Sequence, residues 1–240
     1  MSENKTGKYL KYAIGEIILV VIGILIALQI NNWNEARKNE KRIIGYMINL
    51  VEDLKSDVNL FNENLMFYDV DIKGNEFILT SDAFKQLDVD SILKLVTNVY
   101  LIDRSTRQTY EKIKNEGLIE SLGSKKINNA INTYYNIDIV YYQNILKWDK
   151  EYTDKGFDFW FLNKNYEVSS VRDYNTNALP FLTSATKRKA DLITLIESIE
   201  GRNHIRGSLI RKKHAQRRVT EIKQSAEDLI EMLNKELEGG

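Results

Sequence analysis

The pattern of hydrophobic and polar positions begins with one long apolar segment. This segment, residues 12–30, reads YAIGEIILVVIGILIALQI, and Glu16 is its only charged residue. As a helix it would extend roughly 28 Å, about the thickness of the hydrocarbon region of a bilayer. Tyr12 lies at one end and Trp33 follows the other, as in the aromatic belts of membrane proteins. The pattern therefore predicts a transmembrane helix over residues 12–30, preceded by a basic tail over residues 1–11.

Two other interpretations of the apolar segment fit less well. A buried core helix of this length normally carries polar residues along one side. A cleaved signal peptide has a shorter apolar region that ends in small residues at a cleavage site. This segment continues instead into QINNWN (residues 29–34). We therefore expect an uncleaved membrane anchor.

Beyond the anchor, apolar positions recur at spacings of three and four. The series is Ile44, Met47, Val51, Leu54, Val58, Phe61, Leu65, Tyr68 and Ile72, then the polar Asn75, then Leu79. This heptad repeat is typical of a coiled coil or a long bundle helix. Pro is absent from this part of the chain, so nothing forces the helix to end. We expect one helix from about Lys8 to Leu79, including a juxtamembrane part over residues 31–42.

The same heptad register, continued backwards, includes Gly23 and Glu16 in the membrane segment, and Ala27 follows Gly23 by four residues. Small residues at this spacing allow two helices to approach closely, although glycine is also common in membrane helices generally. Glu16 lies about one turn inside the membrane boundary, where its carboxylate can reach the headgroups. We expect Glu16, Gly23 and Ala27 to make interfacial or helix–helix contacts.

The remaining sequence also has helical periodicity. Only one Pro is present and breakers are sparse. We expect helices over residues 92–101, 104–116, 125–152, from Ser184 or Thr186 to Gly201, and 203–237, with an irregular connection over residues 163–183. Asp90-Ser91 should cap the first of these helices, Gly117 should end the second, and Ser124 should cap the third. The sequence thus predicts an all-α protein in which the N-terminal transmembrane helix continues into a long helix of an extramembrane helical bundle, residues 43–238.

Composition narrows the classes of function. The chain has 34 basic and 34 acidic residues, so its charge gives no reason to expect a nucleic-acid partner. It contains no Cys, which excludes disulfides and thiolate metal sites. His204 and His214 would point roughly 80° apart on one helix, so they are no metal pair. Phosphate-binding glycine loops and nucleophile motifs are absent from the sequence. We expect no catalysis, no metal and no cofactor.

Two groups of residues are candidates for binding. The run from Arg202 to Arg218 is basic, and Arg211, Lys212, Arg217 and Arg218 could contact phosphate. The alternative is a solvated helix face paired with acids such as Glu197 and Glu200, which we favour.

The second group consists of two tyrosine pairs one heptad apart, Tyr134-Tyr135 and Tyr141-Tyr142. Aromatic residues at helical spacing usually belong to a core. Their hydroxyl groups could instead line a small polar ligand cleft between helices.

Two blocks of sequence carry a family resemblance. The first is YAIGEIILVVIGILIALQINNWNE, residues 12–35, and the second is TYEKIKNEGLIESLGSKKINNAINTYY, residues 109–135. They resemble recurrent blocks of an uncharacterised family of single-span membrane proteins from Bacteroidetes-type bacteria with a helical domain of unknown function. The resemblance implies a bacterial inner-membrane protein with a helical extramembrane domain. It implies no activity, ligand or catalytic residue.

These observations favour a membrane-anchored helical module for binding, sensing or assembly. Its expected partners are the lipid bilayer and either a second copy of the chain or an envelope protein. One alternative is a structural homo-oligomer or a subunit of a larger envelope complex, and another is a pore or transporter accessory that uses Glu16. Lysines lie closest to the anchor on its N-terminal side, which favours a cytoplasmic N-terminus and a periplasmic domain.

Overall fold

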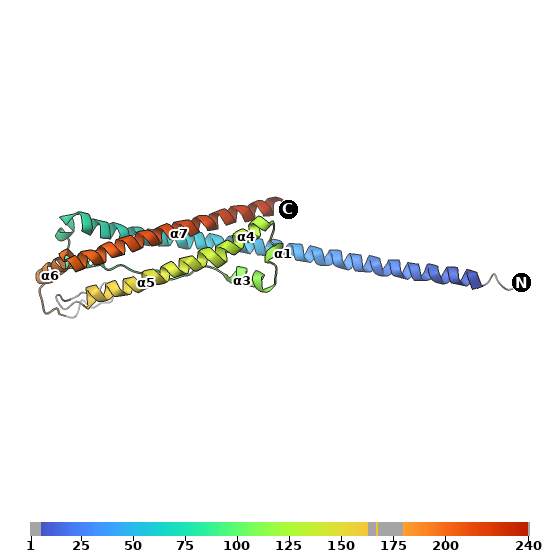
Figure 1. Ribbon diagram of the computed structural model, residues 1–240, viewed down its shortest axis with the longest axis horizontal. Helices are drawn as coiled ribbons and strands as arrows, with labels where there is room; N and C mark the ends of the chain where they lie inside the picture. Colours follow the sequence, from blue (N-terminus) through green and yellow to red (C-terminus); the bar gives the residue numbers. More distant parts are fainter. Residues whose placement is uncertain (1–5, 163–166, 168–179, 240) are drawn as a thin grey trace.

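The computed structural model describes residues 6–162, 167 and 180–239, and the side chains of these from residue 13 onwards. The described residues form helices and connecting segments without a strand. The bundle consists of three long helical elements, of which two run in the same direction and the third runs antiparallel to them, and a single helix projects from one end of the bundle (Figure 1). The predicted all-α fold, with an apolar N-terminal helix that continues into the bundle, is confirmed.

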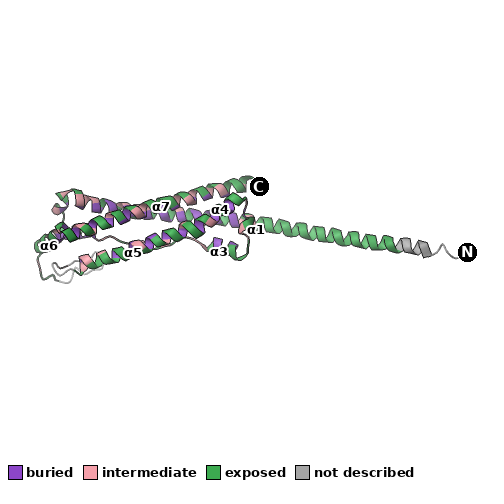
Figure 2. Cartoon of the chain, in the orientation of Figure 1, coloured by how far each residue is buried: buried purple, intermediate pink, exposed green. Residues whose placement is uncertain are grey.

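Helix α1 spans Thr6–Thr80 without interruption. Its 75 residues make a rod of roughly 110 Å at 1.5 Å per residue. From residue 13 to residue 42 its side chains are exposed, and burial begins near Ile43 (Figure 2). Thus one helix contributes both the apolar projection and a central element of the core.

The heptad positions of α1 are filled from within the chain. Met47, Leu54, Phe61 and Tyr68 are buried in one core cluster together with residues of α5 and α7. Ile44, the first position of the predicted series, is exposed. From Met47 onwards, the described part of the bundle therefore covers this seam without a second copy.

Helix α7, Ile199–Gly239, runs antiparallel to α1. The Arg202 guanidinium donates to the Leu79 carbonyl at the end of the bundle far from the anchor, and Lys212 pairs with Asp71 further along. The C-terminal end of α7 lies beside the point where α1 leaves the bundle (Figure 1). This pairing covers α1 along the full length of the bundle.

The third long element consists of α4, Lys125–Thr133, a π-helical turn η3, Tyr134–Asp138, and α5, Ile139–Phe161. The sequence predicts one helix over residues 125–152, whereas the element contains a π-helical turn and extends to Phe161. Ser124 caps its start as expected, because its side chain accepts from the Ile127 N–H. A π-turn leaves a carbonyl without its usual partner, and the Arg107 guanidinium donates to the carbonyl of Tyr135 at 2.8 Å.

Short elements connect the long ones. They are η1, Asp82–Gln86, α2, Val89–Val96, α3, Gln108–Asn115, η2, Ile119–Ser121, and α6, Ala185–Glu197. Asp88 caps α2, two residues before the expected cap, and the helix ends at Val96. Gly117 has φ 70°, in the left-handed region as its position after α3 predicts.

The segment from Thr97 to Arg107, which we call the strap, has no helix although helix was predicted for parts of it. Polar side chains hold the strap in place. Asp57 accepts from the Thr106 N–H at 2.7 Å, and Gln143 donates to Asp103 at 2.6 Å. These long-range bonds outweigh local helix propensity. The predicted connection over residues 163–183 lies almost wholly outside the described residues.

The boundary between α6 and α7 lies at Ser198, three residues before the predicted break at Gly201. The Ser198 hydroxyl accepts from the Gly201 N–H at 3.0 Å and so caps α7. Gly201 is buried, and a Cβ atom there would lie 2.0 Å from the Leu195 carbonyl oxygen. The glycine permits the close turn between the two helices and does not end either one.

Candidate functional site

The most unusual feature of the bundle interior is a row of four charged side chains from three helices, which we call the ion-pair row. It runs from Asp71 on α1 to Lys212 on α7, then to Asp149 on α5 and back to Arg211 on α7. The Lys212 ammonium lies 3.2 Å from Asp71 and 2.9 Å from Asp149, and the Arg211 Nε lies 2.8 Å from Asp149. Charges alternate along the row and sum to zero.

Because the ion-pair row is buried, its pairing affects how the helices pack. Lys212 and Asp149 have 0% exposure, and Arg211 has 7%. Burial raises the pKa of the Asp71 carboxyl, and the neighbouring Lys212 opposes that rise. Lys212 also donates to the Val99 carbonyl at 2.6 Å, and so attaches the strap to the row. A buried ion pair contributes little net stability, but loss of one partner leaves an uncompensated charge. The row therefore fixes how α1, α5, α7 and the strap fit together.

Uncharged polar side chains continue the polar interior toward the end of the bundle far from the anchor. The Ser208 Oγ accepts from the Asn75 amide at 3.2 Å and from the Asn98 amide at 2.7 Å. Asn75 was the polar residue in the predicted heptad series, and the structure gives it a partner on α7.

A small pocket lies next to Arg211 and Ser208, with a volume of about 30 Å³. Its walls come from α2, the strap, α5 and α7. The lining residues are Val96, Thr97, Asn98, Tyr152, Thr153, Gly156, Phe157, Trp160, His204, Ile205, Ser208 and Arg211. At about 10–15 Å³ for each water, this space holds roughly two water molecules or a group of similar size.

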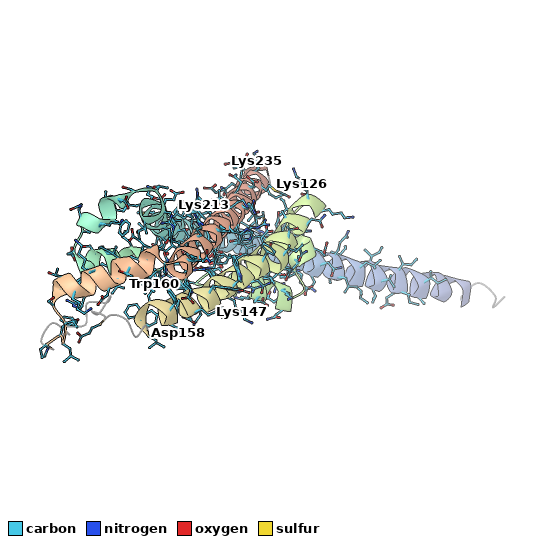
Figure 3. The ribbon with its side chains drawn as sticks, turned by 60° about the vertical axis from the view of Figure 1, so that its left-hand side comes forward. Lys126, Lys147, Asp158, Trp160, Lys213 and Lys235 are labelled. Carbon is cyan, nitrogen blue, oxygen red and sulfur yellow. The ribbon has the colours of Figure 1, made fainter. Side chains whose placement is uncertain are left out.

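Aromatic rings form one side of this pocket. His204 stacks on Phe159 with ring centroids 3.9 Å apart, and Trp160 lies edge-on to His204. Burial lowers the pKa of His204, against the charge of Glu200. Trp160 is almost fully buried, and Figure 3 shows it near the end of α5. The pocket thus combines an aromatic wall with a polar floor.

A second polar layer lies closer to the anchor. Asp57 on α1 is fully buried and accepts from the Tyr134 hydroxyl at 2.8 Å. Burial raises the pKa of Asp57 to about 6, and the hydrogen bonds from Thr106 and Tyr134 oppose this rise. One heptad further along α1, Asn64 donates to the Tyr142 hydroxyl at 2.7 Å.

These contacts place three of the four tyrosines in the core, the first of the two interpretations of the tyrosine pairs, and not along a ligand cleft. Tyr134, Tyr135 and Tyr142 are buried core residues, and Tyr141 is 46% exposed with the Arg218 guanidinium 4.8 Å from its ring. The three buried rings pack against α1 because the broad aromatic face of this element is covered by α1 and the strap. The pocket lies elsewhere and contains none of the four.

The four basic residues predicted as possible phosphate contacts fall into a buried pair and a surface pair. Arg211 and Lys212 face the interior, so they are not available as surface phosphate contacts, and their partners are Asp149 and Asp71. Lys213, the next residue, lies on the outside of α7 (Figure 3). The other two members remain near the surface: Arg218 pairs with Glu221, and Arg217 lies 4.0 Å from the same carboxylate.

Sequence reasoning missed Asp57, Asp71 and Asp149, the acidic residues that organise the interior. A signal for two of them existed: Asp57, Asn64 and Asp71 recur at intervals of seven on α1. A polar residue that keeps the hydrophobic period points inward and needs a buried partner.

The membrane-segment residues Glu16, Gly23 and Ala27 lie on the exposed part of α1. An isolated helix keeps 3.6 residues per turn, because it has no partner to supercoil around. Gly23 then lies about 7.5 turns before Leu50, on the opposite side from the buried face. On this ideal geometry the heptad register does not stay on one face of α1, and we expect the face that carries Gly23 to point away from the bundle.

The described part of the chain holds no group of three or more His, Cys, Asp or Glu side chains suited to a metal ion. It contains one helix long and apolar enough to cross a membrane, Ala13–Thr80, and none of its most apolar window is buried. These features define a class of all-α protein in which a long apolar helix continues into a bundle with a buried ion-pair row.

The chain belongs to the DUF6090 family, a family of unknown function, whose model matches residues 16–199. The match confirms the predicted membership of an uncharacterised family. Searches of curated proteins and of solved structures found no match.

Proposed function

We propose that this protein is a non-catalytic module of a bacterial inner membrane, in which a single span carries a helical binding or assembly domain. The observation that carries the proposal is the continuity of α1, which is exposed and apolar over the predicted span and buried in the bundle core beyond residue 43. A helix without a flexible joint holds the domain at a set height and orientation above the bilayer.

The juxtamembrane part of α1 sets that height. Residues 31–42 are helical and exposed, and they extend roughly 18 Å. The headgroup region on one side of a bilayer is about 5–8 Å thick. The base of the bundle is thus lifted clear of the lipid surface, where a partner can reach it. In the proposed orientation the N-terminus is cytoplasmic and the bundle is periplasmic.

Membrane fractionation tests the anchor. We expect the full chain to stay in the membrane pellet after alkaline carbonate extraction. A chain that lacks residues 1–30 should move to the soluble fraction. Release of the full chain by carbonate would contradict a spanning helix.

A second candidate function, a structural homo-oligomer, is favoured by the geometry of α1. Glu16, Gly23 and Ala27 lie within about 40° of one another on ideal helix geometry, on the side of α1 away from the bundle. Two copies could therefore pair through this face in one bilayer. The two bundles would then lie on the outer sides of the helix pair and would not obstruct the contact. Asn34 lies about 20° from Gly23 around the helix, and Asn39 lies about 160° from it.

These two asparagines provide a matched pair for cross-linking. In membranes, Asn34→Cys should form a disulfide-linked dimer upon oxidation, whereas Asn39→Cys should remain monomeric. Equal cross-linking of both variants, or none of either, would argue against pairing through this face.

A further inference from the structure

We propose that the pocket beside Arg211 binds the carboxylate group of a small organic acid. The proposal deepens the proposed function, on which it rests, by assigning a ligand class to the domain. The pocket lies within the bundle and is separate from the membrane helix, so its test is independent of the anchor.

Arg211 has more N–H groups than it uses in hydrogen bonds to the described residues. A guanidinium carries five N–H groups in a fork that matches a carboxylate. The hydrogen bonds of Arg211 within the described residues run from Nε to Asp149 at 2.8 Å and from one terminal nitrogen to Thr153 at 3.4 Å. This buried side chain also lines the pocket, so N–H groups remain for a ligand there.

Ser208 supplies a second donor. Its Oγ accepts two amide N–H groups, from Asn75 and Asn98. Both lone pairs of the hydroxyl are then engaged, and its own proton is left to donate. Arg211 and Ser208 lie three residues apart on α7, so they face the same side of the helix. Within the described residues the Asn75 Oδ1 also lacks a partner, so it is the Arg211 N–H groups, more than the hydroxyl proton, that favour an acceptor such as a carboxylate in the pocket.

The order of charges in the ion-pair row gives the pocket its polarity. The row has Asp71 at one end and Arg211 at the other, and Arg211 is the member that lines the pocket. Although the row is neutral as a whole, its positive end meets the pocket. A cationic ligand would find no carboxylate among the described residues that line the pocket.

Shape and surroundings limit the ligand. A volume of about 30 Å³, room for roughly two water molecules, accepts a small head group such as a carboxylate. Tyr152 and Phe157 line the pocket and are about half exposed, so they mark its open side. A short alkyl chain attached to the carboxylate would lie against these two rings. Short monocarboxylic acids fit this combination.

Gly156 allows the pocket to be closed without disturbing the ion-pair row. It lines the pocket, and a Cβ atom there would meet nothing within 4 Å. Gly156→Leu should therefore fill the pocket mouth. Gly207→Leu is the matched control, because Gly207 is also helical, also open, and not part of the pocket.

The experiment is calorimetric titration of the full chain in detergent with sodium butyrate at constant ionic strength, with butylammonium chloride as the probe of opposite charge. We expect saturable butyrate binding by the wild type and by Gly207→Leu, and at least a tenfold weaker affinity in Gly156→Leu. Circular dichroism confirms that both variants retain their helical content.

Three results would overturn the proposal: no saturable butyrate binding by the wild type, equal binding by Gly156→Leu, or equal binding of butylammonium. If Gly156→Leu loses helical content, Phe157→Ala replaces it, since this half-exposed residue lines the pocket and otherwise stacks on Phe161 alone among the described rings. Undiminished binding by Phe157→Ala would also count against the site. The carbonate extraction result stands whichever outcome is found.

Discussion

At the scale of single residues, the interior of this bundle depends on a few charged groups with defined partners. Lys212 has three: Asp71, Asp149 and the Val99 carbonyl. Its neighbour Lys213 makes one ion pair at the surface, with Glu76 at 2.6 Å. The two lysines differ by one position and about 100° of rotation, yet one is fully buried and the other exposed.

This contrast predicts very different costs of removing each charge. Lys212→Met should destabilise the protein by about 3–5 kcal/mol, because Asp71 and Asp149 lose a buried partner. Lys213→Met should change stability by less than about 1 kcal/mol. Urea unfolding of the full chain in detergent, followed by circular dichroism, measures both. Similar values for the two variants would show that the ion-pair row is not fixed in the way described.

Asp57 should make stability depend on pH. Its pKa is raised to about 6 in the folded protein, mainly by burial, from 3.8. A raised pKa means that the folded state favours the protonated form. The contribution to stability is therefore complete below the unfolded pKa and is lost as pH rises through about 6. The difference between the two pKa values corresponds to about 3 kcal/mol.

The variant Asp57→Asn removes this titration. From pH 8 to pH 4 the wild type should gain up to about 3 kcal/mol relative to Asp57→Asn in urea unfolding. Asp158→Asn, at an exposed position, serves as the control and should follow the wild type. A constant difference between wild type and Asp57→Asn across this range would exclude Asp57 as a buried titrating group.

At the scale of elements, helix boundaries are decided by caps and close contacts. Ser198 ends α6 and caps α7, and Gly201 fits beneath it against the Leu195 carbonyl. Gly207, six residues later on the same helix, has open space where a side chain would be. The two glycines thus have different reasons to be present.

Alanine substitutions should separate these reasons. Gly201→Ala should destabilise the protein by about 1–3 kcal/mol, since its Cβ would overlap the Leu195 carbonyl oxygen. Gly207→Ala should stabilise it by about 1 kcal/mol through helix propensity. Thermal unfolding of the two variants side by side gives the signs. A stabilising Gly201→Ala would mean that the α6–α7 turn is more open than described.

At the scale of the whole molecule, α1 connects the anchor with the bundle, and the native chain has no Cys to interfere with labelling. Val20→Cys should be protected from a membrane-impermeant maleimide. Asn39→Cys should react in intact cells with a permeabilised outer membrane, because the bundle is proposed to be periplasmic. Reaction of Asn39→Cys only after lysis would reverse the orientation, and reaction of Val20→Cys would contradict the span.

The sequence by itself determined the features that depend on neighbours in the chain. The apolar run and the absence of Pro predicted α1 almost to its ends, and Ser124 and Gly117 marked a helix start and a helix end correctly. Such signals act within a few residues, through hydrogen bonds to adjacent backbone or through restricted dihedral angles.

Only the tertiary structure decided which polar residues meet. Asp149 is 62 residues from Arg211 and 63 from Lys212, and no local rule relates them. The basic run looked like a surface because charge alone does not reveal which helix face is buried. The sequence of the strap predicts helix in part, but its partners on α1 and α5 hold it in a non-helical conformation. These distant polar groups adopt one arrangement because each of them is buried and must find a hydrogen-bond or ion-pair partner in the interior.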